Sequence, residues 1–202
     1  RRADFVSFGR GVPPLFKQCD QPWRDQTYTA GSTATFCGRG CYVCSAVSLT
    51  AWAGYDVDPI AFAQAIDSVG AFAGPDLSYP EKIPDVYPKL VWGVDSFQNW
   101  REVPANLDLL IELLQEQPVI VEVDYKPETG AVDQHFVLAY EYVYPSGESE
   151  LDDDLMVMCP MVGYTSVLHY FNPDWYGSWM IENGVTRVAR TLTGARVFRF
   201  EG

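Results

Sequence analysis

Histidine and cysteine are both scarce in the 202-residue chain, which has only His135 and His169 and an odd number of cysteines, five. Two histidines exclude a histidine-rich metal site and leave two candidates for any mechanism that needs an imidazole. With five cysteines, at least one must be free, intermolecular, metal-bound or reactive. The cysteine count does not fix the redox compartment, because disulfide frameworks usually occur in much shorter chains.

Basic residues and long apolar runs are also lacking. The chain has 14 Lys and Arg against 27 Asp and Glu, a formal net charge of −13, which argues against nucleic acid or an anionic membrane as the main partner. No run approaches 18 apolar residues, so we expect no insertion into a membrane. The chain begins Arg-Arg-Ala-Asp without a Met, and we expect a processed form or an excerpt. No compartment is fixed, with a secreted or otherwise extracytoplasmic one favoured.

Length and composition describe an ordinary globular protein. Apolar residues make up 48% of the chain and charged residues 20%, and a chain of this size can bury roughly two-thirds of its unfolded surface. There is no internal repeat and no low-complexity tract. We therefore expect a single domain over residues 1–202, with residues 1–12 as an irregular N-terminal extension.

The first half of the chain is predicted to hold helices separated by irregular segments. A glycine turn at 38–40 leads into an apolar run with helical spacing, which predicts a buried helix over 41–53 that a glycine ends. Asp58 followed by Pro59 is typical of a helix start, and it predicts a second helix to about residue 69. Residues 70–105 show no clear period and should contain at most short elements.

The second half is predicted to begin with one helix and to continue as strands. Leucines and an isoleucine on one face predict a helix over 106–117, and the β-branched run at 119–123 is too apolar for anything but a buried strand. Further strands are predicted at 135–143, 155–159, 166–171, 178–182, 185–192 and 195–200. Helices followed by strands indicate an α+β fold, with N-terminal helices packed on an antiparallel sheet from the C-terminal half.

Cys41 is the first candidate for chemistry, because it follows the glycine turn and begins the buried helix. Unpaired N–H groups and the helix dipole favour an anion there, and they lower the pKa of a thiol towards the reactive thiolate. The alternative is that Cys41 is a small apolar residue packed under the turn. Position alone leaves both interpretations open.

His135 is the better candidate for a base, because it follows a polar loop and opens an apolar strand. His169 lies inside an apolar segment, where a packed histidine is the simpler interpretation. Cys41 and His135 are therefore the best available nucleophile and base, although such a pair must come within about 3 Å, which sequence cannot show. Gln18 is a weaker candidate: a lone glutamine is usually a surface residue, but its amide could donate to a developing oxyanion.

These residues lie in segments that together resemble the C39-like peptidase family, which has a papain-like fold. The resemblance covers about residues 13–165 and depends on five loose motifs in one order: Q-x-D-x-x-W, G-C, G-x-x-x-D-P, P-V-I-V and H-F-V. In this chain they are Gln18–Trp23, Gly38–Cys41, Ala53–Pro59, Gln117–Val121 and His135–Val137. The resemblance implies a cysteine peptidase acting on a peptide or protein, with Cys41 as nucleophile, His135 as general base and Gln18 as oxyanion donor.

One segment departs from the family pattern. After the histidine strand the family has a second strand that ends in Asp-Pro with a Gly shortly behind, and here the matching residues are Cys159, Pro160 and Gly163. Cys159 thus takes the position of the acid that would orient His135, and a neutral thiol is a weak acceptor. Asn172 offers a second register, because asparagine serves as the third residue in papain-like enzymes.

The departure leaves two functions open. One is an active cysteine peptidase, whose residues would equally support acyl transfer to an amine or a thiol. The other is a catalytically weakened or inactive papain-like domain that serves as a structural or binding module. Assembly with further chains is also possible, and the sequence does not name a substrate.

Two metal-based alternatives have less support, and we expect neither a metal nor a cofactor. Cys37, Cys41 and Cys44 have the spacing of the iron–sulfur motif of radical SAM enzymes, but the chain lacks the alternating β/α units of that barrel. Zinc held by Cys41, Cys159 and His135 is the second alternative, because a papain-like register would bring those three residues together.

Overall fold

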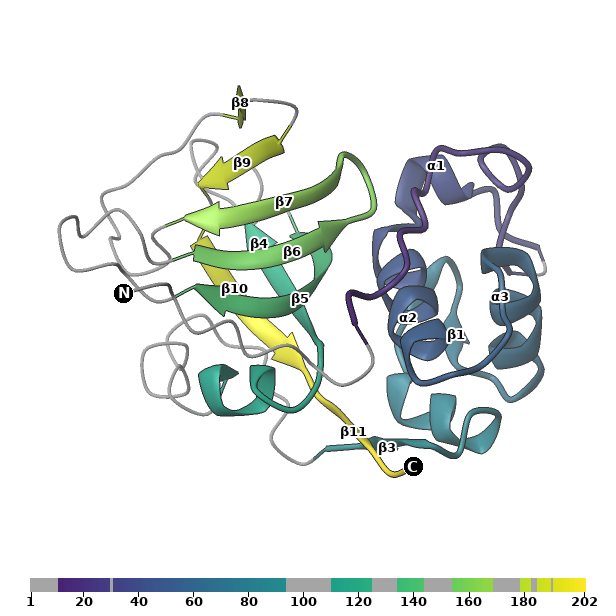
Figure 1. The fold of residues 1–202 in the computed structure, drawn as a ribbon. Helices are drawn as coiled ribbons and strands as arrows, with labels where there is room; N and C mark the ends of the chain where they lie inside the picture. Colours follow the sequence, from purple (N-terminus) through teal and green to yellow (C-terminus); the bar gives the residue numbers. More distant parts are fainter. Residues whose placement is uncertain are drawn as a thin grey trace, which may run out of the picture.

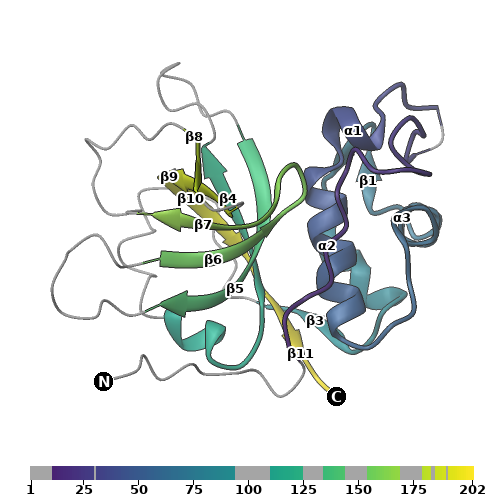
Figure 2. The same cartoon turned by 45° about the horizontal axis from the view of Figure 1, so that its top comes forward.

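The computed structural model describes residues 11–29, 31–93, 110–124, 134–143, 154–168, 179–182, 185–189 and 191–202. Helices from the N-terminal half pack on a sheet from the C-terminal half, which confirms the predicted α+β class (Figure 1). The N-terminal helices, within residues 36–68, and the large sheet form two adjoining parts of the molecule in both ribbon views (Figure 2). No helix in the described ranges is both long and apolar enough to span a bilayer.

The helical part is arranged around one central helix. Its elements are α1 (Phe36–Arg39), α2 (Cys41–Trp52), α3 (Pro59–Ser68) and the 3-10 helix η1 (Pro80–Asp85). The predicted helices over 41–53 and 58–69 are thus confirmed to within a residue. As expected, the Asp58 side chain caps α3, accepting a hydrogen bond from the Ala61 N–H at 2.8 Å. The sequence predicted a turn before Cys41, and the structure adds the short helix α1 there.

Helix α2 is buried on all sides, as its continuous apolar sequence predicts. Ser45 and Thr50 lie within it without being exposed, because their hydroxyls donate to the backbone carbonyls of Phe136 and Ala46 at 3.2 and 2.8 Å. Gly54 ends the helical segment with φ +92°, a left-handed conformation that glycine adopts without strain.

The large sheet has the strand order β10-β4-β5-β6-β7-β9-β8. Its strands are β4 (Val119–Asp124), β5 (Gln134–Val143), β6 (Asp154–Cys159), β7 (Gly163–Leu168), β8 (Trp179–Glu182), β9 (Val185–Ala189) and β10 (Thr191–Arg196). The five strands from β10 to β7 are antiparallel, as predicted. β9 instead runs parallel to β7, because the β8–β9 hairpin joins the sheet through its second strand.

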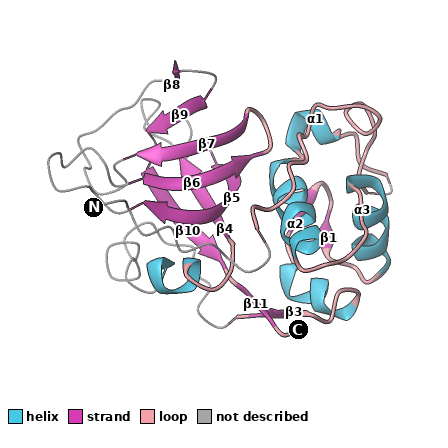
Figure 3. Ribbon diagram, in the orientation of Figure 1, coloured by secondary structure: helices cyan, strands magenta, loops and turns pink. Residues whose placement is uncertain are grey.

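The smaller strands make two separate pairs. β1 (Phe72–Ala73) pairs with β2 (Asp76–Leu77), and β3 (Leu90–Trp92) pairs with β11 (Phe198–Phe200). The elements within 70–93 are short, as expected. The predicted strands 185–192 and 195–200 are wrong in their division, since the chain forms β9, β10 and β11 instead. The last of these leaves the large sheet and returns to the helical part (Figure 3).

The two faces of the sheet carry different cores. Ile120, Phe136 and Leu138 belong to the cluster that includes the helices. Val121, Val137 and Ala139 alternate with them and belong to a second cluster with Leu110, Leu113 and Leu114. Residues 110–114 are helical and form the described part of the helix predicted over 106–117. β4 and β5 are therefore buried on both faces, as their near-continuous apolar runs predict.

Candidate functional site

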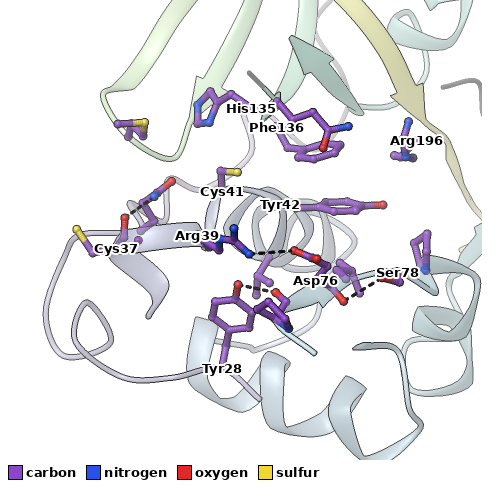
Figure 4. Close-up of a pocket in the computed structure, with 18 residues that line it drawn as sticks. Tyr28, Cys37, Arg39, Cys41, Tyr42, Asp76, Ser78, His135, Phe136 and Arg196 are labelled. Atoms are coloured by element: carbon purple, nitrogen blue, oxygen red, sulfur yellow. Dashed lines mark hydrogen bonds and ion pairs between the residues drawn. The ribbon is translucent and has the colours of Figure 1, made fainter. Parts of the chain in front are cut away.

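A pocket of about 850 Å³ lies between the start of α2 and the start of β5 (Figure 4). Gln18, Cys41 and His135 all line it, so the fold brings the three predicted site residues together. In Figure 4 the Cys41 side chain points towards the strand that carries His135 and Phe136. His169 and Asn172 lie outside the described residues, as do residues 1–10 of the predicted N-terminal extension.

Cys41 is the first residue of α2, and Gly40 is the residue before it. The N–H of Gly40 donates to the carbonyl of Phe36 at 2.7 Å, and a Cβ atom at residue 40 would lie 2.5 Å from that oxygen. Only glycine allows so close an approach. Glycine is therefore required before Cys41, because the backbone of residue 40 packs against the Phe36 carbonyl where α1 ends and α2 begins at the pocket.

The Cys41 thiol is half-buried, and two opposing effects act on its pKa. Burial raises the pKa, while hydrogen bonds from the backbone of Phe136, Tyr42 and Cys41 itself lower it. The net direction is upward from the usual value. The sequence-based expectation of a lowered pKa is therefore wrong for this state of the molecule, because loss of solvent outweighs the N–H groups at the helix start.

The backbone of one residue, Phe136, ties α2 to β5. Phe136 hydrogen-bonds through its backbone to the Cys41 sulfur, and its carbonyl accepts a hydrogen bond from Ser45 Oγ at 3.2 Å. Cys41 and Ser45 are four residues apart and so lie on the same face of the helix. His135 immediately precedes Phe136, so these contacts also set the distance between the nucleophile candidate and the base candidate.

His135 is buried, with 4% of its surface exposed, and its Nε2 lies 3.2 Å from the Cys159 sulfur. Cys159 ends β6 and pairs with Gly163 of β7, so the second strand of the predicted motif does deliver this residue to the histidine. The direction of the hydrogen bond depends on which ring nitrogen carries the proton. The position next to His135 is thus held by sulfur, as the sequence predicts.

Gln18 is buried at 4% exposure rather than being a surface residue. Its Nε2 donates to the carbonyl of Cys37 at 2.8 Å, and its backbone N–H donates to the carbonyl of Pro160 at 2.8 Å. Its Oε1 is buried and has no hydrogen-bond partner. The glutamine therefore connects α1 with the β6–β7 turn at the edge of the pocket.

Cys19 and Cys37 form a disulfide, whereas Cys41, Cys44 and Cys159 are thiols. The disulfide removes Cys37 from the cysteine set of the radical SAM alternative. Among the described residues no group of three or more His, Cys, Asp or Glu side chains is arranged to hold a metal ion. The zinc alternative built on Cys41, Cys159 and His135 therefore receives no support.

One wall of the pocket is aromatic and charged. The ring of Phe136 stacks on Tyr42 with centroids 4.3 Å apart, and the Arg196 guanidinium lies 5.4 Å from the Phe136 ring. Arg196 forms a buried ion pair with Glu122 at 2.8 Å. Burial raises the pKa of the Tyr42 hydroxyl, so this wall is neutral or internally paired at neutral pH.

The opposite rim carries an exposed ion pair. Arg39 and Asp76 approach to 3.8 Å, and both side chains are more than half exposed. Beneath them the Tyr28 hydroxyl donates to the carbonyl of Pro75 at 2.6 Å. Burial, with a smaller contribution from Asp76, raises the pKa of Tyr28 to about 12, so this hydroxyl is a donor and not a base.

Sequence reasoning missed Ser45, the Phe136 backbone and the Cys19–Cys37 disulfide. Ser45 lies four residues after Cys41, and that spacing was the available signal. The pairing of Cys19 with Cys37 carried no signal, because five cysteines allow many connectivities. In comparisons with known proteins, the chain matched no family model, no curated protein and no solved structure.

Proposed function

We propose that the chain is a papain-like cysteine peptidase that hydrolyses a peptide or related amide bond. The observation that carries the proposal is the single pocket lined by Cys41, His135 and Gln18, three residues from separate parts of the sequence. A nucleophile at a helix start, an imidazole on the facing strand and an amide at the same edge are the parts that acyl transfer requires.

In this mechanism the Cys41 sulfur attacks the carbonyl carbon of the substrate while its proton passes to His135. A neutral starting thiol suits the raised pKa of Cys41, because the base then removes the proton as the S–C bond forms. The second N–H of Gln18 Nε2, beyond the one bonded to Cys37, donates to the developing oxyanion. His135 returns its proton to the leaving amine, the C–N bond breaks, and water hydrolyses the thioester.

A catalytically weakened module is the second candidate, and one contact favours it. The residue in the acid's position is Cys159, so a sulfur and not a carboxylate lies 3.2 Å from the His135 ring. A neutral thiol stabilises an imidazolium poorly. On this alternative the pocket binds a peptide and turns it over slowly or not at all.

Cysteine mapping and peptide cleavage together separate the two candidates. The chain is treated with a limiting amount of a chloromethyl ketone peptide at neutral pH, and the labelled cysteine is identified by mass spectrometry. The peptidase predicts rapid labelling of Cys41 together with cleavage of a mixed peptide library. Labelling no faster than that of a free thiol, with no cleavage, would overturn the proposal in favour of the binding module.

A further inference from the structure

The disulfide beside the pocket joins the segment that carries Gln18 to the helix that precedes Cys41. Cys19 is the residue next to Gln18, and Cys37 lies in α1. Three residues, 38–40, separate Cys37 from Cys41. Cys37 also lines the pocket. The covalent link therefore lies between the two residues that would act on the reacting carbonyl.

Gln18 is not held in place by a complete set of its own side-chain hydrogen bonds. One amide N–H is bonded to the carbonyl of Cys37, but Oε1 is buried without a partner. A buried acceptor without a donor disfavours this placement of the side chain. Some other interaction must offset that cost, and the adjacent crosslink is the strongest one available in this segment.

We propose that the Cys19–Cys37 disulfide is a positioning device that keeps the Gln18 amide at the oxyanion site. The inference rests on the proposed peptidase function and adds a requirement to it: an oxidised cysteine pair beside a reduced nucleophile. The backbone bond from Gln18 to the Pro160 carbonyl at 2.8 Å fixes one side of the residue. The disulfide fixes the other side, so the amide has little freedom to rotate out of the pocket.

Both disulfide cysteines are partly exposed, which makes the link accessible to reagents. A phosphine converts it, with one water, to two thiols and a phosphine oxide. Cys41 is a thiol before and after this treatment. The effect of the disulfide on the site can therefore be measured in the intact chain, without changing the nucleophile.

The test is a double-mutant cycle read with substrate and with a peptide aldehyde. The aldehyde takes up the Cys41 sulfur and its proton across its C=O bond, and its oxygen then occupies the oxyanion site. The variants are Cys19→Ser/Cys37→Ser, Gln18→Ala and the triple change. We expect disulfide loss to lower kcat and aldehyde affinity about tenfold or more with KM nearly unchanged, and to have no further effect in the Gln18→Ala background.

The outcomes separate the inference from the function beneath it. An unmodified chain that neither cleaves peptides nor binds the aldehyde overturns both. An active chain in which disulfide loss and Gln18→Ala act additively, or in which KM and kcat change together, overturns the inference alone. If the double serine variant does not fold, phosphine reduction of the unmodified chain replaces it. Aldehyde affinity must then fall on reduction and recover on reoxidation, and an unchanged affinity also overturns the inference.

Discussion

On the helical side of the pocket, a disulfide joins the neighbour of Gln18 to the short helix before Cys41, and the Gln18 amide donates to a backbone carbonyl of that helix. On the sheet side, the base candidate His135 lies 3.2 Å from the sulfur of Cys159. A disulfide and an N–H···O bond define geometry closely. A sulfur is larger and a weaker hydrogen-bonding partner, so it orients an imidazole less well. If the chain is the proposed peptidase, we therefore expect the orientation of the base, rather than the position of the nucleophile, to limit its activity.

Removal of the proposed nucleophile, on the helical side of the pocket, should have the largest effect on peptide cleavage. We expect Cys41→Ala to abolish cleavage, a loss on the order of a million-fold, as for nucleophile removal in a serine protease. The measurement is kcat/KM on the best peptide from the library. Cys44→Ala is the matched control, since that thiol lies on the same helix, is fully buried and does not line the pocket. If Cys41→Ala cleaves the peptide as fast as Cys44→Ala does, Cys41 is not the nucleophile.

Loss of the Gln18 amide should be the next largest effect. Gln18→Ala should lower kcat about a hundredfold with little change in KM, because an oxyanion donor acts mainly in the transition state. Gln21→Ala is the control, as that exposed glutamine lies in the same segment. If both substitutions leave kcat unchanged, Gln18 has a structural role and is not the oxyanion donor.

A carboxylate in place of Cys159 should bring the sheet side closer to the helical side. We expect Cys159→Asp to raise kcat by about tenfold, because an anion fixes the imidazole tautomer and stabilises the imidazolium; losing that acid costs about ten-thousandfold in a serine protease. The pH profile of Cys41 alkylation should extend to lower pH. Cys159→Ala serves as the control. A profile that moves in neither variant, with folding intact, would show that Cys159 is not the third residue.

Ser45 tests the contact that joins the two sides. Ser45→Ala should lower the free energy of unfolding by about 1 kcal/mol, because the Phe136 carbonyl loses its hydroxyl donor in a buried position. Ser48→Ala is a close control: its hydroxyl is equally buried but donates to the sulfur of Met158 at 3.8 Å. Urea unfolding measures both, and the hypothesis requires the larger loss, together with a lower kcat, in Ser45→Ala.

High pH should produce the smallest effect, and the two buried thiols of α2 should contribute to it. Burial raises the pKa of the Cys41 and Cys44 thiols above the usual 9.0. Above that pH the unfolded chain ionises first, so the contribution of these thiols to stability is complete below about pH 9 and decreases as pH rises further. Urea midpoints between about pH 8 and about pH 10.5 should fall. The urea midpoint of Cys44→Ala should fall less steeply with pH than that of the unmodified chain. An equal slope would contradict the assignment of this pH dependence to the buried thiols.

Sequence patterns predicted the parts of the fold that are set locally. The apolar run after Gly40 gave α2, and Asp58 with Pro59 gave the start of α3, since both depend on neighbouring residues. The parallel pairing of β9 with β7 and the exit of β11 towards β3 were missed. Both depend on which distant strands meet, and periodicity carries no such information.

The candidate site divides in the same way. The sequence-based choice of Cys41, His135 and Gln18 as site residues came from motif order rather than from any single residue. The structure places all three on one pocket, and their roles stay predictions. The direction of the pKa shift at Cys41 was predicted wrongly, because burial is a tertiary property. The disulfide was not predicted at all, since nothing near Cys19 in the sequence points to Cys37.

The ring of Phe136 has two close neighbours: it stacks on Tyr42, and the Arg196 guanidinium lies 5.4 Å from its centroid. Its backbone is engaged as well, by the sulfur of Cys41 and the hydroxyl of Ser45. A ligand in the pocket therefore cannot stack on the face of Phe136 that Tyr42 covers without displacing that tyrosine. Phe136 thus holds helix α2 against the sheet. We expect its replacement by a small residue to separate the two halves of the pocket before it changes any preference for a substrate side chain.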